Sequence, residues 1–396
     1  CGVMTSSIRI FFAVGEPSGD ALGAQLIKAL RDVGPPNMLF EGMGGPAMEA
    51  QGLKSLYPIA DTSVMGLKEV VPKIPVILRR VRDIVDAAII SRPNLVVLID
   101  SPDFTHRIAR RLKRLAPEIP IAKYVAPQVW ASRPWRARKL ATFVDHLLAL
   151  LPFEAAFFER YGLRTHFVGH PALERGVAPH EQEVAAFRTR YSAGGNAPLL
   201  VLLPGSRSNE IRFILPVFLD VARALKQKIP DMKFVLPTVA HVRDRVAEQL
   251  RSLPFEIALI EGEHEKLLAF RSATAALAAS GTVTTELALA RCPMVVAYRV
   301  GWLTAMLARP FIQGKFATLV NLVLDEGVIP EFLQDACTAK RIYPAIEALM
   351  NSSSEREKQT GRTLPALQRL GLGGEAPSRR AARAILEIVD AGDRPA

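Results

Sequence analysis

The sequence contains few cysteines, few aromatic residues and no long apolar run. Its three cysteines, Cys1, Cys292 and Cys337, show neither metal-binding nor redox spacing, so we expect a reducing compartment and no metal site. No apolar run approaches the ~20 residues that span a bilayer. Neither a disulfide-stapled secreted domain nor an integral membrane protein is therefore expected.

Two common phosphate-binding motifs are absent as well. The loop after the apolar run 199–204 is not a Walker motif, because Asn209-Glu210 follow it and no Gly-Lys-Ser/Thr does. The glycines at positions 15, 19 and 23 do not fit the dinucleotide fingerprint. We expect no cofactor.

The chain is instead rich in apolar residues (49%) and in basic ones. Its 50 Lys and Arg residues outnumber its 39 Asp and Glu residues, which gives a formal net charge of +11. This excess favours an anionic partner, either a nucleotide, an acidic lipid or a nucleic acid. At ~150 residues per domain, the length predicts two globular domains.

Strands and helices alternate along the chain, which predicts an α/β fold with doubly wound parallel sheets. Apolar runs predict strands at 8–14, 40–45, 95–99, 121–125, 146–151, 165–168, 199–204, 234–237, 257–260, 274–278 and 293–298. The polar stretch 172–198 is the expected linker. We therefore expect domains at 4–178 and 198–340, followed by a helical segment at 341–396.

Two acidic residues of the first domain follow predicted strands. Open α/β sheets bind ligands at the carboxyl ends of their strands, so Asp100 is well placed for chemistry. Glu16 lies where a pyrophosphate would otherwise bind, and its carboxylate suits sugar hydroxyls better. The alternative for Glu16 is an acid that pairs with the dipole of the helix capped by Ser18. We expect Asp103 to be the N-cap of the next helix.

Two loops of the second domain start helices with small or hydroxylated residues. Gly205-Ser206-Arg207 can offer free backbone N–H groups and a guanidinium to a phosphate, although an ordinary turn with a surface arginine is equally compatible. In the segment 280–286, Gly281, Thr284 and Thr285 precede Glu286, which can accept two ribose hydroxyls. A simple capping glutamate is the alternative there.

The segment 64–90 combines apolar and basic residues. Pro72 and Pro75 exclude one continuous helix. Its apolar side chains either pack in the core or dock on anionic lipid. The apolar residues concerned are Met65, Leu67, Val70, Val71 and Ile74, with the 301–311 segment as a further apolar surface. The Arg- and Trp-containing segment 133–139 suits either stacked bases or a lipid interface.

A series of ordered motifs resembles the lipid A disaccharide synthase family. They are VGEPSGD (14–20), MGLKEV (65–70), IDSPDF (99–104), YVAPQVWA (124–131), LPFE (151–154), FVGHP (167–171), LLPGSRSNEI (202–211), ASGTVTTELAL (279–289), CPMVVAYR (292–299) and NLVLDE (321–326). The similarity extends from about residue 8 to residue 388. One departure is the set of extra hydroxyls in 280–286, where related sequences have alanines.

The resemblance implies an inverting, metal-independent GT-B glycosyltransferase whose two Rossmann-like domains face a cleft. Such enzymes join UDP-2,3-diacylglucosamine to 2,3-diacylglucosamine 1-phosphate and release UDP. By resemblance, Glu16, Asp100, Arg207 and Asn321 are functionally important, and the loops 205–207 and 284–286 hold UDP. Asp100 is the expected base, and Glu16 is expected to orient the sugar.

The family pattern also implies a location and an assembly. C-terminal helices return to the N-terminal domain of the same or a partner chain, so an exchanged homodimer is expected as one arrangement. The enzyme would lie on the cytoplasmic face of the inner membrane of a Gram-negative bacterium. Two alternatives stay open: a UDP-N-acetylglucosamine epimerase of the same architecture, and a non-catalytic basic protein that binds nucleic acid.

Overall fold

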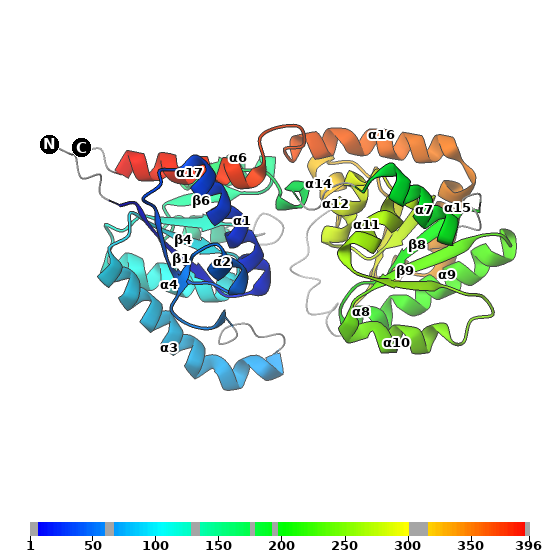
Figure 1. Cartoon of the computed structure of the whole chain (residues 1–396), viewed down its shortest axis with the longest axis horizontal. Coiled ribbons are helices and arrows are strands. Elements are labelled where there is room, and N and C mark those ends of the chain that lie inside the picture. The colour runs from blue at the N-terminus through cyan, green and yellow to red at the C-terminus, as the bar shows by residue number, and fades with distance from the viewer. Residues whose placement is uncertain are drawn as a thin grey trace. The chain divides into compact units, whose positions relative to one another are not determined.

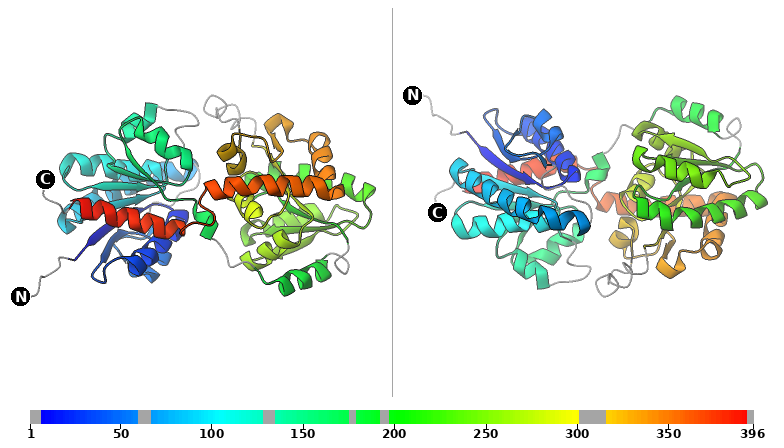
Figure 2. Two further views of the ribbon diagram at one scale, coloured as in Figure 1. Left: turned by 90° about the horizontal axis from the view of Figure 1, so that it is seen from above. Right: turned by 90° about the horizontal axis from the view of Figure 1, so that it is seen from below.

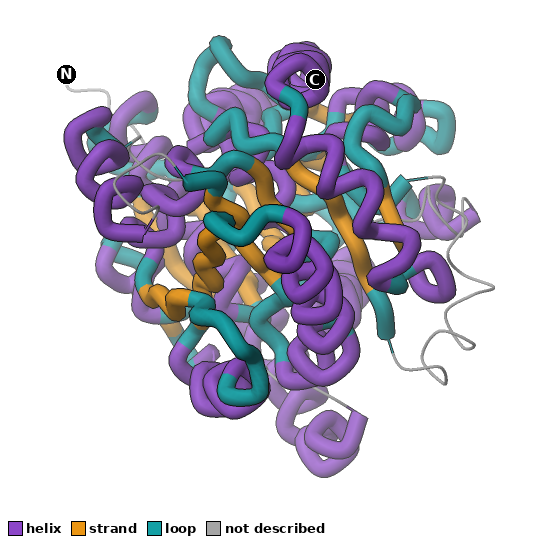
Figure 3. The backbone as a smooth tube through the Cα atoms, turned by 90° about the vertical axis from the view of Figure 1, so that its right-hand side faces the viewer, coloured by secondary structure: helices purple, strands orange, loops and turns teal. Residues whose placement is uncertain are grey.

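The computed structural model describes residues 7–59, 67–127, 135–174, 179–191, 197–300 and 316–392, without the side chains of 67–73. The chain divides into two compact units. Unit 1 comprises residues 1–171 and 373–396, and unit 2 comprises residues 172–372. The strands lie between helices (Figure 3).

Unit 1 is built on a seven-stranded parallel sheet with the order β3-β2-β1-β4-β5-β6-β7. The strands are β1 (Arg9–Val14), β2 (Leu39–Met43), β3 (Lys54–Ser55), β4 (Leu95–Ile99), β5 (Ile121–Tyr124), β6 (His146–Ala149) and β7 (Arg164–Phe167). The central strand β4 is buried along its whole length, as expected for a parallel strand covered on both faces.

Helices cover both faces of this sheet. They are α1 (Pro17–Val33), α2 (Pro46–Ala50), α3 (Leu67–Ser91), α4 (Pro102–Leu115), α5 (Trp135–Leu140), α6 (Pro152–Glu159) and α17 (Pro377–Gly392); a 3-10 turn at Pro171–Glu174 lies at the boundary with unit 2. Alternate residues of each strand point to opposite faces. Phe12 therefore packs with α1 and α17, whereas Phe11 packs with α3 and α4.

Unit 2 contains a six-stranded parallel sheet with the order β10-β9-β8-β11-β12-β13. The strands are β8 (Leu199–Leu203), β9 (Lys233–Thr238), β10 (Ala258–Glu261), β11 (Ala275–Ala278), β12 (Met294–Tyr298) and β13 (Glu331–Leu333). The helices are α7 (Glu181–Tyr191), α8 (Ser208–Phe213), α9 (Leu215–Lys228), α10 (Ala240–Leu250), α11 (Glu263–Ser272), α12 (Thr282–Leu289), α14 (Leu319–Leu324), α15 (Ala339–Asn351) and α16 (Ser353–Arg369), with a 3-10 turn at Gln334–Ala336.

The last helix returns to the first unit, as predicted. α17 packs beside α1 (Figure 1), and its buried apolar stripe joins the core on that face of the sheet. Ala381 and Ala382 are fully buried, and these small side chains permit a close helix approach. Arg380 anchors the helix to the end of β7, because its Nη2 donates to the Phe167 carbonyl at 2.8 Å.

The prediction that prolines interrupt the segment 64–90 was wrong. α3 is one helix of 25 residues that contains both Pro72 and Pro75. Pro72 and Pro75 are its sixth and ninth residues, so each leaves one carbonyl of the preceding turn without an intrahelical N–H donor. Burial of Val81, Ile84 and Val85 against the sheet stabilises the rest of the helix, which lies beside α4 (Figure 2).

Two expected boundaries also differ from the structure. The predicted linker 172–198 contains α7, which packs on α11 of unit 2, and Arg190 contacts Glu265 there at 2.6 Å. The predicted C-terminal segment 341–396 divides after residue 372, since α15 and α16 belong to unit 2. Strand β13 was not predicted, because its three residues give too short a pattern.

Candidate functional site

In unit 1 the strand order reverses between β1 and β4, which lie side by side. This is the topological switch point, where open α/β sheets bind ligands. Glu16 follows β1 and Asp100 follows β4, so the structure brings these two predicted residues to the same edge of the sheet. The Ser18 hydroxyl connects the two loops by donating to Asp100 Oδ2 at 3.2 Å.

The backbone at this edge adopts unusual conformations. Asp100 and Ser101 both have positive φ values (50° and 40°), and Val125 after the neighbouring β5 has a φ of 74°. Left-handed conformations are uncommon for non-glycine residues and costly for a β-branched one such as valine. The turn also lies close to the first loop, because a Cβ at Gly15 would be 3.0 Å from Ser101. Clustered strain of this kind is typical of functional sites.

A buried lysine stabilises this turn. Lys123 on β5 is only 1% exposed, and its ammonium donates to the Asp100 carbonyl and to Thr105 Oγ1 at 3.0 Å. Burial lowers the pKa of Lys123 to about 7, against the opposing effect of the negative charges of Asp100 and Glu16. This residue was not among those predicted from the sequence. Its signal was a lysine inside an otherwise apolar strand, where a charge needs a partner.

The expected helix caps in unit 1 were wrong. Glu16, not Ser18, is the N-cap of α1, and its exposed side chain makes no capping hydrogen bond. Ser101 is the N-cap of α4, while Asp103 lies in the first turn and is exposed. Pro17 and Pro102 at the first helical positions account for both shifts, since proline favours that position.

Asp20 has a structural role at the same loop. Its buried carboxylate accepts hydrogen bonds from Gly45 N, Ala47 N and Met48 N at 2.9 to 3.0 Å, which satisfies the start of α2. The motif 14–20 therefore combines an exposed carboxylate at Glu16 with a buried one at Asp20.

Unit 2 contains a cavity of about 720 Å³ at the carboxyl ends of β8, β9, β10 and β11. It includes the switch point of this sheet, between β8 and β11. Its lining includes the predicted residues Gly205, Ser206, Arg207, Gly281 and Glu286. Two loops that are 70 residues or more apart in sequence thus meet at one pocket.

Two backbone N–H groups of the first loop, those of Ser206 and Arg207, are already occupied, contrary to expectation. Glu210 Oε2 accepts hydrogen bonds from Ser206 N at 2.9 Å and from Arg207 N at 3.1 Å. Gly205 has a φ of 112°, and a Cβ there would clash with the Glu210 carboxylate. The Arg207 side chain is 72% exposed, and its guanidinium forms a long ion pair with Glu210 Oε1 at 3.9 Å. The loop therefore presents an arginine rather than free amides.

At the start of α12, Glu286 lines the pocket, whereas Thr284 and Thr285 do not. Glu286 is 9% exposed, lines the cavity and pairs with Lys266 at 2.9 Å. Thr284 Oγ1 donates to its own-turn Gly281 carbonyl at 2.8 Å, and Thr285 is fully buried. Gly281 and Glu286 are therefore in the pocket lining, whereas Thr284 and Thr285 are not.

Lys266 is a second cation of the pocket and was not predicted from the sequence. Burial opposes its charge, but hydrogen bonds and charges from Glu263 and Glu286 outweigh this effect and raise the pKa of Lys266. Thr238, at the end of β9, also lines the pocket, and its buried hydroxyl has no partner among the described residues. Thr238 is the last residue of β9 and Lys266 lies in the first turn of α11, and no sequence pattern singled out either residue.

The structure does not place Asn321 in this pocket. Asn321 is fully buried, and its amide connects α14 to the chain before β13. Nδ2 donates to the Ile329 carbonyl and to Glu331 Oε1, each at 2.8 Å, and Oδ1 accepts from Ile329 N at 2.9 Å. Its polar atoms are thus used within unit 2.

The predicted membrane-contact residues are only partly visible. Met65 lies outside the described residues, as does the 301–311 segment, and the side chains of Leu67, Val70 and Val71 are not described. Ile74 is 44% exposed, and Val76 and Leu78 on the same helix are similarly exposed. Within the described ranges, no helix is long and apolar enough to cross a membrane, and no cluster of acidic, His and Cys side chains could hold a metal ion.

Two Rossmann-like units define the GT-B architecture that glycosyltransferases and some sugar-nucleotide epimerases share. The fold resembles that of CalG4, the calicheamicin glycosyltransferase, with a TM-score of 0.57 and 17% identity over 97% of this chain and 98% of that one. A putative UDP-N-acetylglucosamine 2-epimerase from Listeria monocytogenes gives a TM-score of 0.64 at 13% identity, over 98% and 99% of the two chains. These two likenesses concern the fold alone.

Sequence comparison is more specific. The family model described as lipid-A-disaccharide synthetase matches residues 10–385, and the chain belongs to this family. A lipid-A-disaccharide synthase from Rhodospirillum centenum is 45% identical over 96% of this chain and 95% of its own length. One from Nitrobacter hamburgensis is 44% identical over 98% of both chains. The predicted family and GT-B fold are thereby confirmed.

Proposed function

We propose that the chain joins UDP-2,3-diacylglucosamine to 2,3-diacylglucosamine 1-phosphate, giving lipid A disaccharide 1-phosphate and UDP. Membership of the lipid-A-disaccharide synthetase family over residues 10–385 is the observation that carries this proposal. Fold likeness to an epimerase weighs less, because one architecture hosts different reactions.

The unit 2 pocket is the proposed UDP site. Arg207 and Lys266 line it as cations, and Glu286 lines it as an acceptor for ribose hydroxyls. A leaving diphosphate gains negative charge in the transition state, and a positioned cation stabilises that charge. Because Glu210 occupies the loop amides, the Arg207 side chain is the group of this loop that would contact phosphate.

The unit 1 switch point is the proposed acceptor site. A sugar hydroxyl is a poor nucleophile, so a carboxylate must take its proton as the new bond forms. Asp100 is partly exposed at the end of the central strand β4 and is held by a strained turn, which suits a fixed base. Glu16 is exposed beside it and is the proposed sugar-orienting residue.

Lipid substrates require access to a membrane. We propose that the enzyme acts as a peripheral protein on the cytoplasmic face of the inner membrane of a Gram-negative bacterium, held by α3. The exposed Ile74, Val76 and Leu78 support this role. The packing of α17 on α1 is compatible with a closed monomer or with exchange between two chains, and an exchanged homodimer stays a prediction.

Release of UDP in the presence of both acylated glucosamines, with mass-spectrometric detection of the disaccharide, tests the proposal. The expected result is UDP release that depends on both substrates. Conversion of UDP-N-acetylglucosamine to its epimer, without disaccharide, would instead establish the epimerase alternative. Oligonucleotide binding that collapses with added salt, with no UDP binding, would favour a nucleic-acid-binding protein.

A further inference from the structure

A second cavity, of about 320 Å³, lies in unit 1 between α4 and the turn after α5. Four of its six lining residues are basic: Arg110, Lys113, Arg114 and Lys139, with Thr142 and Phe143 completing the lining. It differs from the candidate acceptor site, because α4 begins beside Asp100 and these residues lie two or more turns further along it.

Most of this positive charge is not neutralised by the protein. Lys113 pairs with Asp145 at 2.8 Å, but no carboxylate of the described ranges pairs with Arg110, Arg114 or Lys139. The nearby His106 adds no charge, because burial, followed by the charges of Lys123, Arg110 and Arg136, lowers its pKa to about 3. The protein thus keeps a net positive surface at this point.

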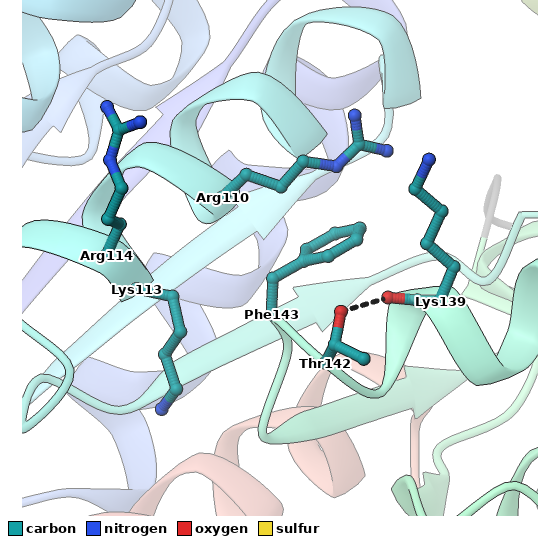
Figure 4. A pocket seen from close by; sticks show the side chains of 6 residues that line it. All are labelled: Arg110, Lys113, Arg114, Lys139, Thr142 and Phe143. Carbon is teal, nitrogen blue, oxygen red and sulfur yellow. Dashed lines mark hydrogen bonds between the residues drawn. The ribbon is translucent and has the colours of Figure 1, made fainter.

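The geometry selects two of these residues. Figure 4 shows the charged ends of Arg110 and Lys139 extending toward one another past the Phe143 ring. The Arg110 guanidinium lies 4.8 Å from the centre of that buried ring, which restricts its orientation. The Thr142 hydroxyl is occupied by its own-turn Lys139 carbonyl at 2.7 Å and does not compete for the site. The Arg110 guanidinium and the Lys139 ammonium could both donate hydrogen bonds to the oxygens of one phosphate group.

Apolar side chains flank this basic cavity. Leu115, next to Arg114, is 48% exposed, and Trp135, at the start of α5, is 62% exposed. Arg136 lies over the Trp135 ring at 5.5 Å. An exposed tryptophan among arginines is typical of a membrane interface, where the ring lies among lipid headgroups and the cations contact phosphates.

We propose that the cavity between α4 and α5 binds the phosphate of an acidic phospholipid headgroup. This site is separate from both proposed substrate sites and from the apolar residues of α3. It would anchor unit 1 to lipids that are not substrates, independently of the transfer reaction.

The test compares vesicle binding by the full chain and by Arg110→Gln/Lys139→Gln. The matched control is Lys28→Gln/Lys54→Gln, which removes the same charge from exposed positions of unit 1 outside the cavity. Vesicles contain phosphatidylcholine alone, phosphatidylcholine with phosphatidylglycerol, or phosphatidylcholine with oleate at matched surface potential. Thermal unfolding of each variant shows whether it is folded. UDP binding, which depends on unit 2, tests the proposed function separately from lipid binding by unit 1.

We expect the cavity pair to weaken binding to phosphatidylglycerol vesicles roughly 30-fold, about 5-fold per residue, and the control pair to have a much smaller effect. Wild-type chain should prefer phosphatidylglycerol to oleate, and the cavity pair should remove this preference. If loss of the Arg110–Phe143 contact impairs folding, two further variants are measured in the same way. Lys139→Gln keeps that contact, and Arg110→Lys keeps the charge. Equal losses in both pairs, no preference for phosphate over carboxylate, or a loss restricted to oligonucleotide binding would each overturn the proposal.

Discussion

The ammonium of Lys123 donates a hydrogen bond to the backbone carbonyl of Asp100, so a buried cation holds the turn that carries the candidate base. A second bond to Thr105 Oγ1 ties the same cation to the first turn of α4. Asp100 and Ser101 have left-handed backbones, and such a turn persists only when its surroundings fix it. Lys123 is therefore a positioning residue for Asp100 rather than a group that touches substrate.

Lys123→Met should lower kcat of the transfer reaction about 10-fold or more while leaving UDP affinity unchanged, because the methionine fills the space but cannot hold the turn. Lys123→Arg, which keeps the charge, is expected to restore part of the loss. Steady-state kinetics with both acylated substrates, together with calorimetry for UDP, provide the measurement. An unchanged kcat in the methionine variant would show that Asp100 does not need this support.

The same lysine predicts a pH dependence of stability. Its pKa falls from an unfolded value of ~10.4 to about 7 in the folded chain, so between these values the unfolded state binds more protons. The cost of burying its charge is therefore fully present below pH 7 and disappears as pH rises toward ~10. The free energy of unfolding of Lys123→Met minus that of wild type should be largest below pH 7. This difference should decrease as the pH rises toward ~10. Denaturant unfolding of both proteins across this range checks the sign.

The isosteric change Asp100→Asn tests the base itself. We expect a decrease of ~100-fold to 10,000-fold in the chemical step, the usual contribution of a positioned base, with UDP affinity unchanged. Asp103→Asn is the matched control, because Asp103 is exposed in the first turn of α4. If Asp100→Asn retains turnover, Glu16 becomes the candidate; if UDP binding is lost as well, Asp100 supports the fold or the nucleotide.

Most of the fold was predictable because buried parallel strands form recognisable apolar runs. Eleven strands were expected, and β1, β4 and β8 illustrate how closely such runs match the structure. The continuity of α3 through Pro72 was not predictable, because tertiary packing of its later turns offsets a local penalty. Helix caps were missed where a proline shifted the first helical position.

The candidate site was predictable only where a residue follows a strand. Asp100 and Glu16 do, and the sheet brings them together. Lys123 had one signal in the sequence, a charge inside an apolar strand, but the partners of Lys123 and Lys266 could be identified only from the structure, because each contacts elements that are distant in sequence. The filled amides of the 205–207 loop depend on the side-chain conformation of Glu210, which no sequence pattern specifies.

Membrane contact through α3 gives a further prediction. Replacing Ile74 and Leu78 by serine should weaken binding to anionic vesicles, because both side chains are exposed and together bury apolar area in the headgroup region. The expected loss is about 10-fold or more. Leu56→Ser is the control, since Leu56 is 46% exposed elsewhere in unit 1. Vesicle sedimentation at low and high salt measures the effect, and unchanged binding would return the α3 surface to a purely structural role.

The final prediction concerns Arg207, the exposed cation that lines the proposed UDP pocket. Arg207→Ala should reduce transfer by ~3 to 4 kcal/mol of transition-state stabilisation, a loss typical of one electrostatic donor. Lysine should recover only part, because it lacks the bidentate fork. The loss should exceed the effect on ground-state UDP affinity, since the leaving diphosphate gains charge as its bond breaks.

Arg212→Ala is the matched control for this experiment. Arg212 is also an exposed arginine and lies on α8, whose N-cap is Arg207, but it is not in the pocket lining. The transfer rate of the control should stay within about twofold of the wild-type rate. Surface substitutions usually change free energies by less than about 0.5 kcal/mol, which corresponds to about that factor. Single-turnover rates and UDP calorimetry on both variants separate chemistry from binding. Near-normal turnover in Arg207→Ala would remove the phosphate role from this loop and transfer it to Lys266, the other cation that lines the same cavity.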